Sequence, residues 1–129
     1  MVDLERWPLV VALPPPERGE DALDLDEFYR ELEQVLLRRR PFVVLFDVTG
    51  VKTLSSCRKR LVEWTNAHDS SIRAQMIALA VVVDSEVERA AVTAAFWNLN
   101  QSYHARIFND AGEAEHWLLA EFARGHGAN

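Results

Sequence analysis

Two serines followed by three cations stand where a helix is expected to begin, and this segment carries the most distinctive chemistry of the chain. Ser55 and Ser56 are followed closely by Arg58 and Lys59. A helix start usually carries acidic residues, because its exposed amide hydrogens and the helix dipole make that end positive. Cations there favour a bound anion, such as a phosphate, a carboxylate or a lipid headgroup. Phosphorylation of Ser56 would supply such a charge, whereas the simplest alternative is that one serine only caps the helix.

Two aspartates form a second candidate site. Asp47 and Asp84 each follow a buried apolar run, and open α/β sheets bind ligands at the carboxyl ends of their strands. Two carboxylates brought together there would suit Mg²⁺. The alternative is that both acids accept hydrogen bonds from the turns that follow, with Thr49 and Gly50 forming the turn after Asp47. We favour the turn role and expect no metal.

The remaining polar residues argue against catalysis. Cys57 and His68 fall on one face of an expected helix but are about 16 Å apart at roughly 1.5 Å per residue, which excludes a nucleophile and base pair. The four histidines have no metal-ligand spacing. The sequence also contains no G-x-S-x-G motif, phosphate loop or dinucleotide fingerprint. We therefore expect no enzymatic activity and no cofactor.

Apolar runs alternate with helical patterns along the whole chain. The expected strands are residues 7–13, 41–48, 76–83 and 105–108, and the expected helices are residues 24–39, 55–73, 86–99 and 110–122. This order predicts one α/β domain over residues 1–129, with a mainly parallel sheet of about four strands and helices packed on it. The last three strands should be parallel, and the pairing of the first is left open. The core should span about 7–122, with a disordered tail at 124–129.

Capping patterns support three of the four helices. Each of these begins with a cap residue followed three positions later by glutamate. The pairs are Asp24 with Glu27, Ser85 with Glu88, and Asp110 with Glu113. The helix that begins near Ser55 lacks this acid, which sets it apart from the others.

Charge and hydropathy restrict the partners and the cellular location that we expect for the protein. The net charge is −6 at pH 7, which argues against nucleic acid and anionic membranes as general partners. Basic residues at 38–40 and 58–60 lie on either side of the expected strand 41–48, so they form two separate clusters. The longest apolar run has eight residues, 76–83, far fewer than the roughly 20 that cross a bilayer. A single cysteine and the absence of a signal-peptide pattern favour a cytoplasmic location.

The segment FDVTGVKTLSS at 46–56 resembles the STAS-domain pattern, in which D-[LV]-[ST]-G-V is followed by a short turn and a serine at the next helix start. Asp47, Thr49, Gly50, Val51 and Ser56 occupy the matching positions. The later pieces AVVVDS, ERAAVTAAFW, RIF and AEHWL follow in the order of the SpoIIAA-like (STAS/SEC14-type) branch. The resemblance covers roughly residues 40–120.

This resemblance implies a small non-enzymatic module of bacterial signalling that acts through protein contacts. Many STAS domains are regulated by phosphorylation of the serine in a D-S-x-G signature at this helix start. Here Ser55 occupies the aspartate position and Arg58 the glycine position. For the SpoIIAA-like branch, the resemblance also implies a hydrophobic or lipid ligand between the helices and the sheet.

The helix at 86–99 contains an unusual stripe of small residues. Four alanines within 90–95 are followed at once by Phe96 and Trp97. The alanines would let the helix lie close to its sheet. Alternatively, they would leave a slot lined by Phe96, Trp97 and Trp64, with the polar segment 98–104 as its rim.

Two functions follow from these features. The first is a cytoplasmic regulatory module that binds a protein partner, with a homodimer as one candidate, through the helix start at Ser56, Arg58 and Lys59. The alternative is a carrier or sensor of a lipid or other small apolar molecule, held near Phe96 and Trp97. The sequence does not identify the partner or the ligand.

Overall fold

The computed structural model describes residues 2–13, 22–49, 54–99 and 103–127, with side chains described in 2–13, 26–49, 59–99 and 103–125. Five strands form one sheet in the order β1-β2-β3-β4-β5. They are β1 (Val2–Asp3), β2 (Leu9–Ala12), β3 (Phe42–Asp47), β4 (Met76–Val82) and β5 (Ala105–Phe108). Five helices accompany them: α1 (Ala22–Leu37), α2 (Leu54–Ala67), α3 (Asp69–Gln75), α4 (Glu86–Trp97) and α5 (Ala111–Gly127).

The sheet is mixed but mostly parallel. Strands β2 to β5 are all parallel, and β1 is antiparallel to β2. The predicted α/β organisation is therefore confirmed, as is the parallel pairing of the last three predicted strands. The pairing of the first predicted strand was left open, and this strand, β2, is parallel to β3. Strand β1 was not predicted, because two residues are too few to show an alternating pattern.

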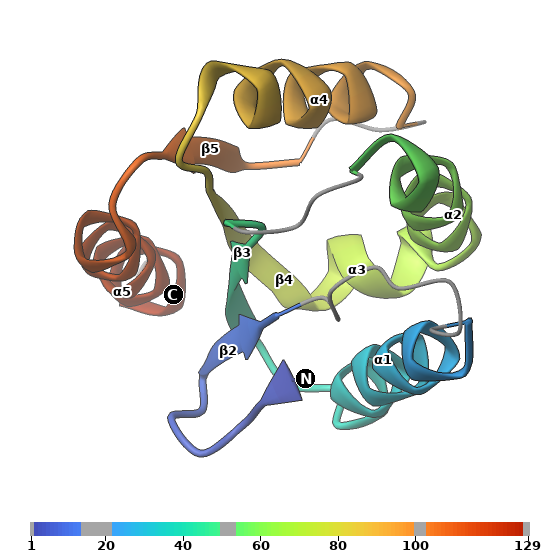
Figure 1. Cartoon of the computed structure of the whole chain (residues 1–129). Coiled ribbons are helices and arrows are strands. Elements are labelled where there is room, and N and C mark those ends of the chain that lie inside the picture. Colours follow the sequence, from blue (N-terminus) through green and yellow to red (C-terminus); the bar gives the residue numbers. More distant parts are fainter. Residues whose placement is uncertain (1, 14–21, 50–53, 100–102, 128–129) are drawn as a thin grey trace.

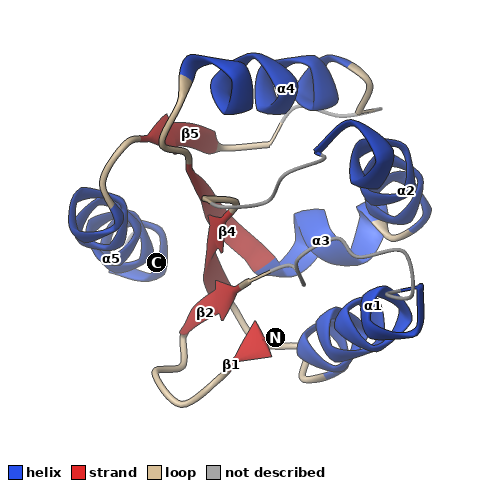
Figure 2. Ribbon diagram, in the orientation of Figure 1, coloured by secondary structure: helices blue, strands red, loops and turns tan. Residues whose placement is uncertain are grey.

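The helices cover the two faces of the sheet unequally. Helices α1 to α4 lie on one face, and α5 lies alone on the other (Figures 1 and 2). The cause is the connectivity. Parallel crossovers are right-handed, and β2 to β5 are adjacent in chain order, so every connecting helix falls on the same face.

Side chains along β4 show how the faces are divided. Ala78, Ala80 and Val82 belong to the buried cluster that includes α5. Leu79 and Val81 point to the opposite face, since successive side chains of a strand alternate, and they pack with residues of α1 to α4. On β4, the residues under α5 are therefore mostly smaller than those under the other helices.

Several predicted boundaries were wrong. The helix expected at 55–73 is interrupted at His68, whose backbone (φ −109°, ψ 17°) leaves the helical region between α2 and α3. The His68 Nδ1 lies 2.8 Å from the Trp64 carbonyl oxygen, a local bond of the kind that competes with regular helix geometry. Helix α1 begins at Ala22, so Asp24 lies inside it and not at its cap. Helix α5 continues to Gly127, through most of the tail expected to be disordered.

The other two predicted caps agree with the structure. The Ser85 side chain accepts a hydrogen bond from the Glu88 amide at 3.1 Å, and the Glu88 carboxylate accepts one from the Asp84 amide at 2.7 Å. At α5, the Asp110 carboxylate accepts from the Glu113 amide at 2.9 Å. These bonds fix the positions at which α4 and α5 leave the sheet.

Candidate functional site

An apolar cavity of about 150 Å³ lies between the sheet and helices α1 to α4. Its walls come from every element on that face. Lining residues include Val44, Phe46, Leu79 and Val81 of the sheet, Phe28, Tyr29 and Leu32 of α1, Leu61 and Trp64 of α2, Ile72 of α3, and Ala95 and Phe96 of α4. Protein cores contain few voids larger than a water molecule, so a space of this size is a feature to be explained.

The packing of α4 accounts for part of this space. Ala91 and Ala95 line the cavity, whereas Ala90 is exposed on the outer side of the helix. Phe96 also lines the cavity, one turn after the buried Val92. Methyl side chains at 91 and 95 do not reach far enough to fill the space below the helix. The alanine stripe is therefore divided between the cavity and the outer surface.

Trp64 is the central polar feature of the cavity wall. His68 stacks on its indole ring with the centroids 4.4 Å apart, and the Tyr29 ring lies 5.6 Å away. The indole Nε1 is buried and has no hydrogen-bond acceptor among the described residues. A buried donor without a partner costs about 1–3 kcal/mol. The Nε1 atom is covered by its neighbours, so it faces neither solvent nor the cavity space.

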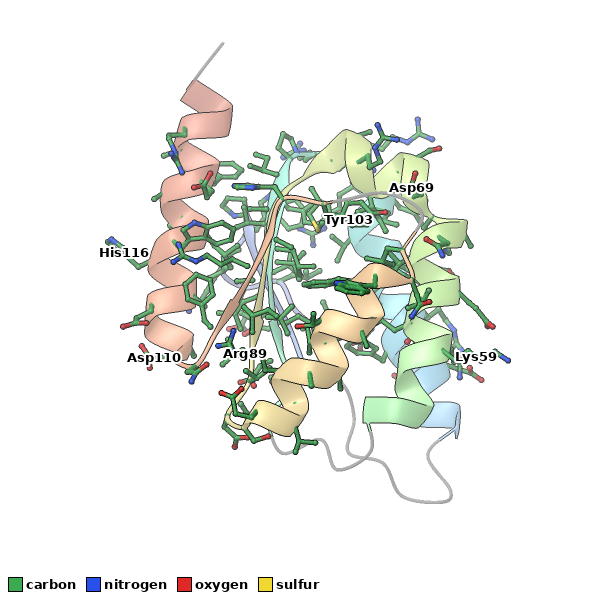
Figure 3. The ribbon with its side chains drawn as sticks, turned by 90° about the horizontal axis from the view of Figure 1, so that it is seen from above. Lys59, Asp69, Arg89, Tyr103, Asp110 and His116 are labelled. Atoms are coloured by element: carbon green, nitrogen blue, oxygen red, sulfur yellow. The ribbon has the colours of Figure 1, made fainter. Side chains whose placement is uncertain are left out.

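Two other polar side chains on the wall, those of Thr65 and Tyr103, donate hydrogen bonds to acceptors of the protein. The Thr65 hydroxyl donates to the Leu61 carbonyl oxygen at 2.7 Å. The Tyr103 hydroxyl donates to the Asp69 carboxylate, and Figure 3 shows these two residues close together beside the start of α3. Burial, and then the hydrogen bond to Asp69, raises the pKa of the Tyr103 hydroxyl well above its usual value of 10.0.

Among the residues that the structure describes, charged groups lie near the cavity but do not line it. None of the described lining residues carries a charge. Arg60 forms an ion pair with Asp26, and its guanidinium lies 5.0 Å from the centroid of the Tyr29 ring. Arg73 lies 3.7 Å from the Asp69 carboxylate. Arg60 and Arg73 thus each have an acidic partner, and most of the described lining is apolar.

The predicted anion site at the start of α2 is only partly described. Helix α2 begins at Leu54, so Ser55 and Ser56 lie inside its first turn and not in the capping position before it. The side chains of Ser55, Ser56 and Arg58 lie outside the described residues. Lys59 is exposed and lies 3.9 Å from the Glu63 carboxylate, directed away from the body of the domain (Figure 3).

The strand-end residues form a turn. The Asp47 carboxylate accepts hydrogen bonds from the Thr49 amide at 2.9 Å and the Thr49 hydroxyl at 2.6 Å, which is the turn role favoured from the sequence. Gly50 lies outside the described residues, and Asp84 is exposed next to the cap of α4. Within the described part of the chain, no three His, Cys, Asp or Glu residues are grouped as metal ligands would be.

The three aromatic residues predicted to share a slot are separated. Trp64 and Phe96 line the cavity, but Trp97 is 86% exposed. Tyr29 and Tyr103 were not predicted as cavity residues. Tyr29 lies next to Phe28 and three residues before Leu32, so the apolar face of this helix gave a signal that could have found it. Tyr103 follows α4 in a connection that has no apolar period.

Comparisons with protein-family models, curated proteins and solved structures give no significant match to this chain. Among the described residues, no helix is long and apolar enough to span a membrane. The fold and the site together define an α/β domain with a mostly parallel sheet and an apolar cavity between this sheet and helices α1 to α4.

Proposed function

We propose that this chain is a non-enzymatic domain that binds a small apolar molecule in the cavity between the sheet and helices α1 to α4. The observation that supports this function is the volume of about 150 Å³ lined by apolar side chains. Unfilled space of this kind leaves its lining side chains without packing contacts, which lowers stability relative to a filled core. A ligand that restores the missing contacts would recover part of that free energy.

The cavity also limits the size of the ligand. An engineered apolar cavity of about 150 Å³ in another protein stays dry and takes up benzene. Apolar pockets of this kind bind through shape and surface burial, with few polar groups to orient the ligand. A single ring or a short chain of about six to nine non-hydrogen atoms fits this description.

Filling the cavity tests the proposal. Replacement of Ala95 by Leu would occupy the space that a ligand needs, and Ala90→Leu is the matched control, because Ala90 lies on the exposed side of the same helix. Thermal unfolding is measured with and without toluene. Toluene should raise the Tm of the wild type and of the Ala90→Leu variant, but not that of Ala95→Leu. Equal shifts in all three proteins, or none, would contradict cavity binding.

A second candidate function is the regulatory protein-interaction module that the STAS resemblance implies. The observation that favours it is the outer surface of α4, where Trp97 is 86% exposed and Val87 is 81% exposed. Tryptophan is enriched among residues that dominate binding interfaces, and an exposed aromatic ring has no role in the core. In this function the chain acts in cytoplasmic signalling, with a homodimer as the simplest partner to test.

Subunit association can be measured directly. Sedimentation velocity of the wild type over a concentration series should show a monomer–dimer equilibrium, and Trp97→Ser should shift it to monomer. Ser71→Ala, an exposed residue of α3, is the control. A wild type that remains monomeric at all concentrations would reject the homodimer.

Phosphorylation of Ser56 stays a separate prediction, which intact-mass measurement of protein from its native source would test.

A further inference from the structure

Four aromatic side chains that line the cavity form a continuous series, here called the aromatic series. The ring centroids of Phe46 on β3 and Phe28 on α1 are 6.1 Å apart. Those of Phe28 and Tyr29 are 5.6 Å apart, as are those of Tyr29 and Trp64 on α2. All four residues contribute to the cavity lining. The sheet, α1 and α2 thus present one aromatic wall to the space.

Phe96 of α4 lines the same cavity apart from the aromatic series. Within the described part of the chain, the Phe96 ring makes no contact with another aromatic ring. Its helical neighbours on the lining, Ala91 and Ala95, have only methyl side chains. An occupant that fills the cavity would therefore contact the aromatic series and also the isolated Phe96 ring.

The described lining offers few hydrogen-bond partners to a ligand. None of its residues carries a charge. The Thr65 hydroxyl donates to the Leu61 carbonyl oxygen at 2.7 Å, and the Tyr103 hydroxyl donates to a carboxylate of α3. The Trp64 Nε1 atom is covered and does not face the cavity space. A ligand group that accepts hydrogen bonds would lose its water without gaining one of these donors.

A flat aromatic ring suits this lining better than an aliphatic chain of similar size. Contacts between aromatic rings contribute binding energy beyond the apolar area that they bury. A rigid ring also has no rotatable bonds, so it loses less conformational freedom on binding than a flexible chain does. Both effects favour an aromatic occupant, and the shortage of hydrogen-bond donors favours one without polar substituents.

We propose, on the basis of the ligand-binding function above, that the ligand is a single-ring aromatic hydrocarbon that packs between Phe96 and the aromatic series. The contacts with these rings favour it over an aliphatic molecule. The lack of available donors among the described lining residues selects against molecules of the same shape that carry a polar atom.

Two hydrocarbon rings test the aromatic contact. Benzene and cyclohexane both have six carbon atoms, and only benzene is aromatic. Their affinities are measured by NMR titration for the wild type and for Phe96→Leu, which keeps an apolar side chain but removes the ring. The ratio of benzene to cyclohexane affinity should fall about threefold in Phe96→Leu, the loss expected for one contact between rings. Phe122→Leu alters a partly buried phenylalanine on the α5 face and should leave the ratio unchanged.

Pyridine tests the exclusion of polar groups. It has the shape of benzene, is uncharged at neutral pH, and differs by one nitrogen that accepts hydrogen bonds. The wild type should bind pyridine about a hundredfold more weakly than benzene, because the nitrogen loses its water and finds no donor. Nuclear Overhauser effects between bound benzene and the Phe96 ring protons should also be seen in the wild type, a measurement that needs no variant.

The outcomes distinguish this inference from the function on which it rests. An unchanged affinity ratio in Phe96→Leu, no Overhauser effect between bound benzene and Phe96, or pyridine binding as tight as that of benzene would each overturn the aromatic-hydrocarbon inference while ligand binding stands. Failure of both hydrocarbons to bind the wild type would overturn the proposed function itself.

Discussion

The two faces of the sheet are packed in opposite ways. Under α5, Ala78, Ala80, Ala114 and Leu118 are fully buried in one cluster, which also contains Leu9 and Leu45 of the sheet. Under α1 to α4, the contacts are made mainly by large side chains, including Phe28 and other aromatic residues, yet a cavity remains. Helix α5 approaches β3 and β4 closely along its length. Small residues at an interface therefore give close packing here, whereas bulky residues hold the helices away from the sheet.

This difference follows from how volume is distributed between the layers. A helix can lie close to a sheet only if the facing residues on one side are small. On the α5 side both layers supply alanines. On the other side, aromatic rings of α1 and α2 meet large sheet residues such as Phe46, while Ala91 and Ala95 of α4 leave their share of the space empty. One face is closely packed, and the other retains an apolar cavity.

Removing a large side chain should lower the free energy of unfolding more on the α5 face than on the cavity side. Leu118→Ala should lower the free energy of unfolding by about 4 kcal/mol, because closely packed neighbours cannot collapse into the new void. Leu61→Ala should cost about 2 kcal/mol, because Leu61 already borders an open space. Urea denaturation of both variants measures the difference. Equal costs would show that the two faces are packed alike.

Adding volume should have opposite effects on the two faces. Ala80→Leu should destabilise the protein by about 3 kcal/mol, because the α5 face has no room for the extra atoms. Ala95→Leu should be neutral or stabilise it by about 1 kcal/mol, since the new side chain enters the cavity. Thermal unfolding without ligand compares them. A large loss of stability in Ala95→Leu would show that the cavity is not available to a side chain.

Tyr103 provides a prediction about pH on the cavity side. Its pKa is raised above 10.0 by burial and by Asp69, so folding favours the protonated hydroxyl. That contribution to stability is complete below pH 10 and is lost as the pH rises towards the pKa of the folded state. Absorbance at 295 nm should show that folded Tyr103 ionises later than a free tyrosine, and Tyr103→Phe should remove this late transition. Ionisation near pH 10 would contradict the buried hydrogen bond.

The smallest effect is expected away from both faces. Arg39 has a left-handed backbone (φ 54°) just after α1, a conformation that glycine adopts without strain. Arg39→Gly should therefore stabilise the protein by up to about 1 kcal/mol. Arg38 does not have a left-handed backbone, so the control variant Arg38→Gly should be neutral or destabilising. Chemical denaturation of the two variants checks the sign.

The sequence predicts the elements better than it predicts the cavity. Caps at Ser85 and Asp110 depend on residues three positions apart, so they can be recognised locally. The interruption at His68 depends on its ring bonding and stacking with Trp64, which no apolar period reveals. The prediction of a parallel sheet depended on all four apolar runs being strands. All four are strands in the structure.

The helical period of α4 could have predicted that its two large aromatic residues differ in burial. Phe96 follows Val92 by four residues and shares its buried face, whereas Trp97 follows Thr93 by four residues and shares its exposed face. The two could have been separated from the sequence. The place of Tyr103 could not have been predicted, because it depends on a hydrogen bond to Asp69, which is far from Tyr103 in the sequence.

The measurement that tests the central claim most directly is an NMR titration of the wild type and the Ala95→Leu variant with toluene. The account predicts saturable shifts for the methyl groups of Leu79 and Val81, which line the cavity, and unchanged signals from Leu118 on the α5 face. It also predicts that Ala95→Leu abolishes the shifts. Unshifted cavity methyl groups in the wild type, or equal shifts in both proteins, would contradict a ligand-binding cavity.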